Sequence, residues 1–409
     1  MSFADACRFL FPRQAGRIKW SLGPTEALLD ALGHPERHFP SVHVGGTNGK
    51  GSTCAFIAAA LRAGGYRVGL YTSPHLVSVC ERMTVNDRPI SEDAFAEWTG
   101  FLRPHIERTE ASFFEATTAI AFADLAARGV DIAVIEVGLG GRLDSTNVVT
   151  PLASVVTKIA LEHTDYLGHD LRGIAREKAG IAKSGVPFIT GERDPEIREV
   201  LMHEAEARDA DPIVLVDTAR APRPGTRLGL RGPHQWANAW VALAALNALP
   251  APFGPVGDDI PPSFAAANVA GRFDVRGGGR WILDVAHNPD GIDVLVAALR
   301  DYGPRRPVHA LVGIRNDKEW RPMLARLLPE VDRVVLTVAP TVPGHQRWIQ
   351  AELGGWTNER VIGQPVVFEP DFVRALELVQ EGAATTLVTG SFHTVGDALA
   401  ALPGFAPVG

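Results

Sequence analysis

The sequence predicts an α/β protein in which a main domain with a mostly parallel, doubly wound sheet is followed by a smaller α/β domain. Two observations lead to this prediction. Apolar runs of strand length alternate with helical patterns, and a glycine-rich turn joins one such run to a helix at residues 42–52. The chain of 409 residues is also long for one hydrophobic core, so two domains are expected.

The turn at residues 42–52 has the composition of a phosphate-binding loop. Its glycines allow backbone N–H groups to surround anionic oxygens, and the following helix presents its positive end. Lys50 can reach terminal phosphates, and Ser52 can contact a magnesium ion. The usual spacing has a glycine in place of Val44 and a hydroxyl in place of Gly51, so the match is to a variant. The pattern predicts a nucleoside triphosphate site, and the alternative is a turn that only joins a strand to a helix.

The elements after this loop continue the alternation. A helix over residues 52–63 and a strand over 67–71 complete a βαβ unit. The next helices are expected at 91–107 and 115–128, and the next strands at 132–137 and 153–157. Loops that carry polar motifs follow the carboxyl ends of these strands, where open α/β sheets bind ligands.

A second domain is expected beyond a helix at residues 235–249. Residues 250–262 are rich in Pro, Gly and Asp, which is typical of a linker. After it we expect a strand, a helix and three further strands, at residues 280–285, 291–299, 308–312, 333–338 and 386–389. The chain is therefore divided into domains of residues 1–267 and 268–409.

Composition excludes several classes of function. The 47 acidic residues exceed the 40 Lys and Arg residues, which disfavours binding to nucleic acid. Cys7, Cys54 and Cys80 contain no CxxC pair, which argues against a disulfide framework or a structural zinc site. No window reaches the roughly 18 apolar residues of a membrane span. We expect a soluble, cytoplasmic and monomeric protein that binds small molecules rather than nucleic acid or a membrane.

Glu136 is a candidate for the same crevice as the phosphate-binding loop, whereas Ser73 and Lys178 each have an ordinary structural explanation. Glu136 ends the strand at 132–137 and precedes a glycine-rich stretch, although it could instead be a capping or ion-pairing acid, with Arg142 as its partner. Ser73 belongs to a Thr-Ser-Pro-His segment, where turn formation alone also explains the Ser-Pro pair. Lys178 could be an exposed helical lysine paired with an acid.

The second domain offers its own cluster. Asp284, His287 and Asn288 lie where the strand at 280–285 ends. Asp284 could be a helix cap, but three polar residues at a strand end favour a binding site. Arg272 could neutralise phosphate charge across a cleft between the domains.

These motifs occur in an order that resembles the Mur ligase family, most closely its folylpolyglutamate synthase and dihydrofolate synthase branch. The likeness extends from about Ile18 to Ser391, and its blocks are GGTNGKGS, TSPH, EVGLGGRLDSTN, LEHTDYLG, REKAGIAKSG and LDVAHNP. It implies a phosphate-loop ATPase domain with pterin-side segments, and a C-terminal domain of Mur ligase type that serves the glutamate side.

The resemblance implies ATP and two magnesium ions as cofactors. The metal ligands would be Ser52, Ser73, Glu136, His163 and Lys178. Lys178 would carry a carbamate made from CO₂ and its neutral amine, which turns a cation into an anion suited to Mg²⁺. His163 rests on the resemblance alone, because Mg²⁺ prefers oxygen and a lone histidine in a loop is more often structural.

The resemblance also implies contacts to nucleotide and amino acid. The nucleotide would be held by Asn48, Gly49, Lys50, Gly51, Ser52, Asn238, Arg272 and Asp284. His287 would position the incoming amino acid, and the catalytic set would be Lys50, Lys178, His163 and His287. Residues 389–391 resemble a further block, but Phe392 and His393 replace the Leu-Tyr expected there.

The folate side is implied by three short blocks: Leu22, Gly23, Pro24 and Thr25, within a segment that begins at Ile18; Phe114, Glu115, Ala116 and Thr117; and Leu143, Asp144 and Ser145. Phe113 and Phe114 could stack on a planar ring, although such residues belong by default to a core. Ser145 replaces an expected alanine, which bears on dihydropteroate activity more than on glutamate ligation.

The implied activity is that of an ATP-dependent carboxylate–amine ligase. It would add L-glutamate to a reduced folate, and as a bifunctional enzyme also to 7,8-dihydropteroate, through an acyl phosphate. A cell-wall ligase of the same family is one alternative, but it would carry a sugar-nucleotide domain before the phosphate loop, where only residues 1–45 stand. A phosphate-loop ATPase or kinase of another class would have no use for LDVAHNP, and a nucleotide-binding module without turnover would not need the metal set.

Overall fold

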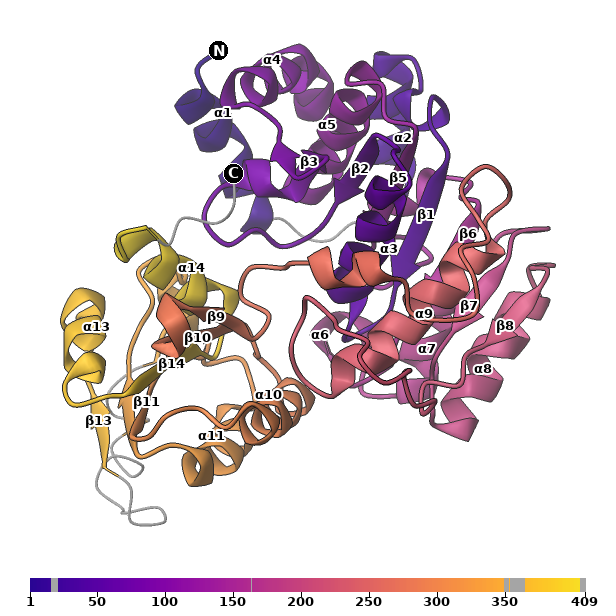
Figure 1. The fold of residues 1–409 in the computed structure, drawn as a ribbon. Helices are drawn as coiled ribbons and strands as arrows, with labels where there is room; N and C mark the ends of the chain where they lie inside the picture. The colour runs from indigo at the N-terminus through magenta and orange to yellow at the C-terminus, as the bar shows by residue number, and fades with distance from the viewer. Residues whose placement is uncertain (16–20, 163, 349–352, 354–364, 405–409) are drawn as a thin grey trace.

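The computed structural model describes residues 1–15, 21–162, 164–348, 353 and 365–404. Within these residues the strands form two sheets, one of eight strands and one of six. The strands of the first sheet end at Leu215 and those of the second begin at Asp274, so each sheet comes from one continuous part of the chain. Figure 1 shows the second part, in orange and yellow, beside the first.

The first sheet has the order β4-β3-β2-β5-β1-β6-β7-β8. The central strand β1 pairs in parallel with β5 and β6, whereas β3 and β4 form an antiparallel edge next to β2. The bounds are β1 Ser41–Gly45, β2 Val68–Tyr71, β3 Met83–Val85, β4 Arg88–Pro89, β5 Ile132–Glu136, β6 Ala153–Val156, β7 Phe188–Thr190 and β8 Ile213–Leu215.

Helices cover both faces of this sheet. On one face lie α3 and α9, and on the other lie the N-terminal helices and the α7–α8 pair. The bounds are α1 Phe3–Leu10, α2 Gly23–Leu32, α3 Lys50–Ala63, α4 Glu92–Thr109, α5 Phe113–Ala127, α6 Thr164–Leu167, α7 Leu171–Ala179, α8 Pro195–Glu206 and α9 His234–Ala248.

Strand β5 shows why the sequence has continuous apolar runs here. Ile132 and Val134 contact the layer of α3 and α9, while Ala133 and Ile135 contact the opposite layer. Because both faces are buried, every position is apolar until Glu136 at the carboxyl end.

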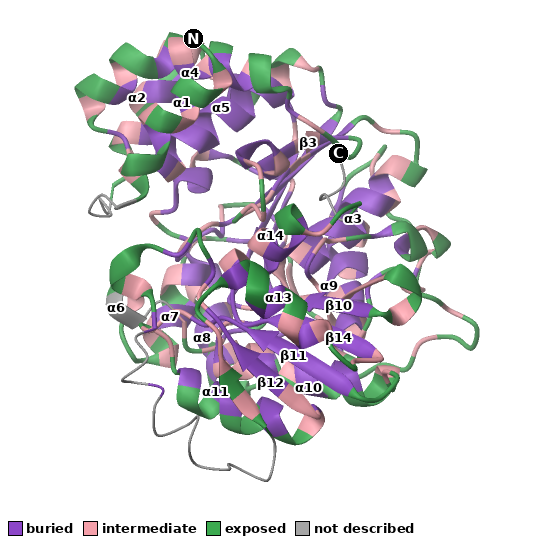
Figure 2. Ribbon diagram, turned by 90° about the vertical axis from the view of Figure 1, so that its left-hand side faces the viewer, coloured by how far each residue is buried: buried purple, intermediate pink, exposed green. Residues whose placement is uncertain are grey.

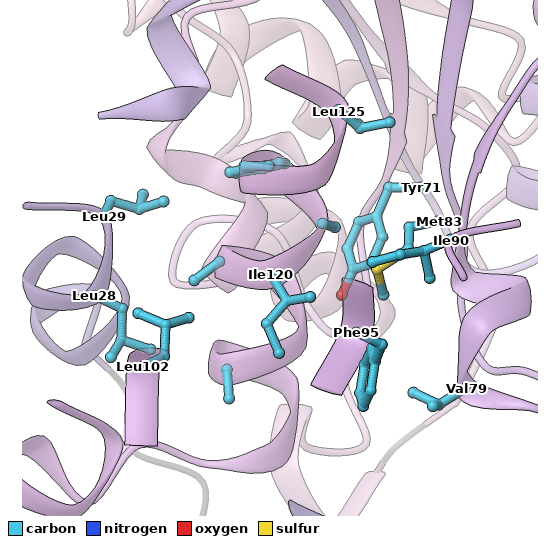
Figure 3. Packing of buried hydrophobic residues seen from close by; sticks show 14 of the residues in the cluster. Leu28, Leu29, Tyr71, Val79, Met83, Ile90, Phe95, Leu102, Ile120 and Leu125 are labelled. Atoms are coloured by element: carbon cyan, nitrogen blue, oxygen red, sulfur yellow. The ribbon is translucent and has the colours of Figure 1, made fainter. Parts of the chain in front are cut away.

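The N-terminal helices bury a large apolar cluster against the sheet. Figure 3 shows the ring of Tyr71, from β2, beside Met83, Ile90 and Phe95. The Tyr71 hydroxyl lies 3.1 Å from Thr118 Oγ1 of α5, so this buried polar group is paired. This cluster fixes α5 over the end of the sheet at which the polar loops gather.

The second sheet has the order β13-β12-β11-β14-β10-β9, parallel except for β9. Strands β11 and β14 are buried along their whole length and β10 and β12 at all but one residue, as Figure 2 shows in purple for β11 and most of β12, because α10 and α11 cover one face and α13 and α14 the other. The bounds are β9 Asp274–Arg276, β10 Trp281–Asp284, β11 Val308–Val312, β12 Arg333–Leu336, β13 Val366–Phe368, β14 Thr385–Thr389, α10 Pro289–Tyr302, α11 Trp320–Leu327, α13 Phe372–Gln380 and α14 Phe392–Ala401.

The predicted fold class is confirmed, and each predicted helix and strand is present with ends within about three residues. The helices and strands that were not predicted are α1, α2, α6, α7, α8, α11, α13, α14, β3, β4, β7, β8, β9 and β13, and most of them are short or lie outside the motifs. The domain boundary at residue 268 stays a prediction.

The predicted linker at residues 250–262 is an ordered loop on the first sheet's side. The Phe253 ring lies 4.9 Å from that of Tyr66, and the Asn247 side chain of α9 accepts from the backbone N–H groups of Val256 and Gly257. Phe264, just beyond, is fully buried against Phe56 of α3. The proline and glycine content of this loop therefore reflects its turns rather than a tether between the sheets.

A membrane-spanning helix is not found in the described part of the chain, since every helix there is too short or too polar to cross a bilayer. Cys7, Cys54 and Cys80 are all free.

Candidate active site

A cavity of about 800 Å³ lies between the two sheets. Loops that follow the carboxyl ends of β1, β2, β5, β10, β11 and β14 contribute to its lining. From the first part of the chain these include Asn48, Gly49, Lys50, Ser73, Phe114, Glu115, Glu136, Leu143, Asp144 and Ser145, and from the second Arg272, His287, Arg315, Lys318, Ser391 and Phe392. The strand-end location that the sequence predicts is therefore where the cavity lies.

The predicted phosphate loop has a backbone that requires glycine. Gly46 has φ of 132° and Gly49 has φ of 94°, values that side-chain-bearing residues rarely adopt. A Cβ at Gly46 would also collide with the Thr157 hydroxyl, and one at Gly49 with the side-chain oxygen of Asn238. Helix α3 begins at Lys50, so its unpaired N–H groups face the same cavity.

Lys50 is folded back onto its own loop. Its Nζ donates to the carbonyl oxygens of Gly46, at 3.1 Å, and Thr47, at 3.0 Å. Both acceptors are neutral, and Lys50 lines the cavity, so an anion that enters can attract this ammonium group.

Glu136 is buried beside the first turn of α3. Its Oε2 accepts from the Ser73 backbone N–H at 3.0 Å, and a Cβ at Gly51 would lie 3.7 Å from its Oε1. Burial raises the pKa of Glu136, while Lys50 and the Ser73 N–H oppose that rise. The ion pair that Arg142 might have offered is excluded, because Arg142 binds Glu177 at 2.7 Å.

The oxygen atoms around Glu136 fit a hard cation. Ser73 follows β2 and lines the cavity, and the Ser52 hydroxyl lies in the first turn of α3, where it accepts from Gln235 Nε2 at 3.2 Å. Carboxylate and hydroxyl oxygens are ligands that Mg²⁺ prefers. No cluster of three or more His, Cys, Asp or Glu side chains suited to a metal occurs among the described residues. His163, the one nitrogen ligand that we predicted, lies outside them.

Lys178 is buried, and not the exposed, acid-paired lysine that was the alternative. It is 3 % exposed, and its Nζ donates to the Gly46 carbonyl at 2.9 Å. Burial, together with the charge of Lys50, lowers the pKa of Lys178 to about 7, although Glu162 and Asp144 oppose this shift. A lysine in this setting is neutral in a large fraction of molecules near neutral pH.

In the second domain His287 reaches across the cavity. Its Nε2 lies 2.8 Å from Glu162 Oε1, and its Nδ1 lies 2.9 Å from the carbonyl oxygen of Val285. The Arg272 guanidinium lies 5.3 Å from the ring centre of Phe392 and, like His287, lines the cavity. Sequence reasoning did not single out Glu162, although it directly precedes His163 in the LEHTDYLG block.

Asp284 does not line the cavity, as far as the described residues define it. Its carboxylate accepts from the backbone N–H groups of Phe273, at 2.8 Å, and Ala286, at 2.9 Å. The helix cap is instead Asn288, which accepts from the Gly291 N–H at 2.7 Å. Asp284 thus fixes the strand end that carries His287.

Asn48 belongs to the predicted phosphate loop, and Asn238 lies beside it. Asn238 of α9 donates to Gln235 Oε1 at 2.9 Å and lies against Gly49. Asn48 donates to Asp290 Oδ2 at 2.5 Å, and Lys158 also bonds Asp290, in the first turn of α10. The two parts of the chain are therefore linked directly beside the glycine turn at residues 46–49.

The folate-side blocks divide in the structure. The cavity is lined by Phe114, Glu115, Leu143, Asp144 and Ser145. The start of α2 is formed by Leu22, Gly23, Pro24 and Thr25, which do not line the cavity. Within α5, Ala116 and Thr117 are buried. Of the segment from Ile18, residues 18–20 lie outside the described residues. The N-terminal residues in the lining are instead Phe11, Arg13 and Gln14, which the motif search missed.

Two carboxylates in these blocks accept hydrogen bonds from backbone N–H groups. Glu115 completes a capping box with Ser112 at the start of α5. Asp144 accepts from the N–H groups of Leu139, at 2.8 Å, and Thr146, at 2.9 Å. Phe113 belongs to the hydrophobic core and also lines the cavity. It is 4 % exposed, and its ring centre lies 5.7 Å from that of Phe11.

Two family descriptions match the chain. Residues 44–221 match the Mur ligase middle domain, and residues 271–392 match the domain described as Mur ligase, glutamate ligase domain. A relative from Bacillus subtilis (strain 168), a dihydrofolate synthase/folylpolyglutamate synthase, is 34% identical over 80% of this chain and 83% of its own length.

Solved structures of similar proteins superpose on nearly the full length of this chain. Mycobacterium tuberculosis folylpolyglutamate synthase complexed with ADP superposes with a TM-score of 0.87 and 32% identity, covering 99% of this chain and 98% of that one. Escherichia coli FolC in complex with DHPP and ADP gives a TM-score of 0.83 and 31% identity, covering 98% and 97%.

Proposed function

The chain belongs to the Mur ligase family, and from this premise we propose that it adds L-glutamate to a reduced folate at the expense of ATP, and that it also accepts 7,8-dihydropteroate. One observation carries the proposal. A single cavity joins the predicted phosphate loop to an arginine and a histidine from the second domain, its lining also includes aromatic side chains, and the buried Lys178 donates to the Gly46 carbonyl of that loop. An ATP-dependent ligase needs all of these groups together.

The first chemical step forms an acyl phosphate. A carboxylate oxygen of the acceptor attacks the γ-phosphorus of ATP, and the bond from that phosphorus to the β–γ bridging oxygen breaks, which releases ADP. Lys50 and the N-terminal end of α3 supply positive charge where the phosphoryl group moves. Arg272 adds a cation from the opposite side of the cavity.

The second step forms the amide. The neutral amine of L-glutamate attacks the acyl carbon, its nitrogen loses one proton to solvent, and inorganic phosphate leaves from the tetrahedral intermediate. No enzyme nucleophile is required, so the protein positions the reactants and excludes water that would hydrolyse the acyl phosphate. We propose that His287 positions the amino acid, held in turn by Glu162.

Magnesium bound with ATP would neutralise phosphate charge, and Ser52, Ser73 and Glu136 would hold it, joined by His163 and the carbamate of Lys178. The burial of Lys178 and its lowered pKa support that modification, since carbamate formation requires the neutral amine. Asn48, Gly49 and Gly51 of the phosphate loop, and Asn238 beside it, would contact the nucleotide. Asp284 would act on it indirectly, by fixing the strand end near Arg272.

We further propose a monomer with domains of residues 1–267 and 268–409. One chain lines the cavity from both domains, so the site needs no second copy. The free cysteines suit a reducing compartment, which supports a cytoplasmic location.

The test is ADP release with tetrahydrofolate or 7,8-dihydropteroate, each with and without L-glutamate. Sustained release that needs both the pterin substrate and L-glutamate, with the amide product detected by mass spectrometry, is the expected result. Release that ignores L-glutamate would point to an ATPase or kinase. Release that needs a nucleotide-linked sugar peptide instead would point to a cell-wall ligase.

A further inference from the structure

Arg82 is a buried cation that the steps above do not use. It ends the short 3₁₀ helix Val79–Arg82 after β2, is 7 % exposed and lines the cavity. Its guanidinium lies 5.0 Å from the ring centre of Phe113, is hydrogen-bonded with the side chain of Tyr71, and donates through Nε to His75 Nδ1 at 2.8 Å.

These contacts give Arg82 neutral partners. Among the described residues its guanidinium forms no ion pair with a carboxylate within 4.0 Å. The adjacent Glu81 accepts instead from the backbone N–H groups of the 76–78 loop, and Glu136 accepts from Ser73. A buried guanidinium is costly unless an anion compensates it, and five N–H donors are more than these partners take up.

His75 adds a second donor. An arginine Nε can only donate, so His75 Nδ1 accepts and the ring proton lies on Nε2. The imidazole is stacked on Phe11, with ring centres 6.2 Å apart and planes 20° apart, and it lines the same cavity. The aromatic rings of Phe11 and Phe113 thus flank two polar groups that both have hydrogen atoms to donate.

We propose that Arg82 and His75 form the subsite for the carboxylate of the acceptor substrate, the group that becomes the acyl phosphate. The inference rests on the proposed function. A flat p-aminobenzoyl ring would lie toward the Phe11 and Phe113 end of the cavity, and its carboxylate would face Arg82. Lys50 lines the same cavity, so the carboxylate can approach the terminal phosphate of ATP while the guanidinium reduces the repulsion between the two anions.

Equilibrium binding in the absence of ATP separates this subsite from a structural role. The two probes are 7,8-dihydropteroate and its carboxamide, which differ only in the charge at the reacting end. We expect the wild-type enzyme to bind the carboxylate about tenfold or more tightly than the carboxamide. Arg82→Gln should bind both probes with the affinity that the wild type has for the carboxamide. His75→Phe, which keeps a ring over Phe11, should lose part of the preference.

Arg128→Gln is the matched control. Arg128 also holds the β3–β4 edge, through the carbonyls of Val85 and Arg88, but lies outside the cavity lining, so its loss should leave the preference intact. Melting temperatures identify any variant that fails to fold, and Arg82→Lys, which retains a cation, should then keep a reduced preference.

The subsite would be overturned if folded Arg82→Gln kept the full wild-type preference for the carboxylate over the carboxamide. It would also be overturned if Arg82→Lys and His75→Phe both kept that preference undiminished. Wild-type binding of both probes with equal affinity would also overturn it while leaving the proposed function standing. Failure of the wild type to bind either probe would overturn the subsite and the use of 7,8-dihydropteroate as an acceptor, and would leave glutamate addition to a reduced folate to the ADP-release assay.

Discussion

Lys50 and Lys178 donate to the same acceptor, the carbonyl oxygen of Gly46, at 3.1 and 2.9 Å. One lysine comes from the phosphate loop and the other from α7, so the shared carbonyl brings two ammonium groups together in a buried place. Their repulsion adds to the desolvation of Lys178. The pair therefore favours loss of one positive charge, and Lys178 is the more buried of the two.

Replacing Lys50 by alanine should lower turnover on the order of a hundredfold or more, because the contact strengthens as phosphoryl charge moves. The turnover is measured as steady-state ADP release. Lys183→Ala is the control, since Lys183 donates to the Asn147 carbonyl outside the cavity lining. Turnover of Lys50→Ala within a few-fold of wild type would refute the phosphate-loop assignment.

Lys178 should carry a carbamate in the active enzyme. With a pKa of about 7, roughly half of the amine is neutral at pH 7. An ordinary lysine, with a pKa near 10.4, is less than ~0.1% neutral at that pH. Carbon-13 NMR in ¹³C-bicarbonate should show a carbamate signal that Lys178→Ala lacks, and that variant and Lys178→Arg should both lose ligation. An enzyme with no such signal and full activity after CO₂ removal would contradict the modification.

Acid should destabilise the protein through His43. This side chain is fully buried in β1, with Nε2 2.8 Å from Thr146 Oγ1, and burial, aided by Lys183, lowers the pKa of His43 to about 3. Between pH 6.5 and 3 the unfolded chain takes up a proton that the folded chain does not. Stability therefore falls with pH in that window, by about 1.4 kcal/mol per unit at most for this group.

The free energy of unfolding in urea at pH 7, 5.5 and 4.5 measures this effect. His43→Gln should show a shallower loss of stability with acid than wild type. His75 and His234, whose pKa values burial lowers to about 3 and 4, remain in both proteins, so the comparison isolates His43. If the free energy of unfolding fell equally with pH in wild type and His43→Gln, His43 would have no part in the acid destabilisation.

Asp290 should help to hold the cleft closed, because it binds Asn48 and Lys158 across it. Asp290→Ala is expected to increase the radius of gyration of the nucleotide-free enzyme in small-angle scattering, most clearly at low salt. Since such partly exposed pairs contribute about 1 kcal/mol or less, a partial shift is expected. Asp293→Ala, on the same helix, is the control, as Asp293 pairs with Arg326 inside the second domain. Equal scattering from both variants would exclude this role for Asp290.

The sequence predicts the fold class and the glycine turn before α3 well, because both depend on local pattern. Gly46 and Gly49, which the pattern marks as turn residues, have the positive φ angles that such a turn requires. The burial of Lys178 could not be predicted, since its partner Gly46 is 132 residues away. The sequence of α7 fits an exposed lysine equally well.

The sequence also does not show which carboxylates reach the cavity. Glu136 and Asp284 both end strands, yet Glu136 lines the cavity, whereas Asp284 accepts two backbone N–H groups. Arg82 lacks a motif of its own, and the role that we propose for it depends on where Tyr71, His75 and Phe113 place it. These differences arise from packing between distant segments, which residue spacing does not encode.

The central claim is that the acceptor carboxylate itself takes the phosphoryl group before L-glutamate attacks. Isotope transfer from dihydropteroate labelled with ¹⁸O in both carboxylate oxygens tests it most directly. An acyl phosphate predicts one ¹⁸O atom in each inorganic phosphate released and one in each amide formed, with no phosphate released in the absence of L-glutamate. Unlabelled phosphate, with both ¹⁸O atoms still on the carboxylate, would contradict the account.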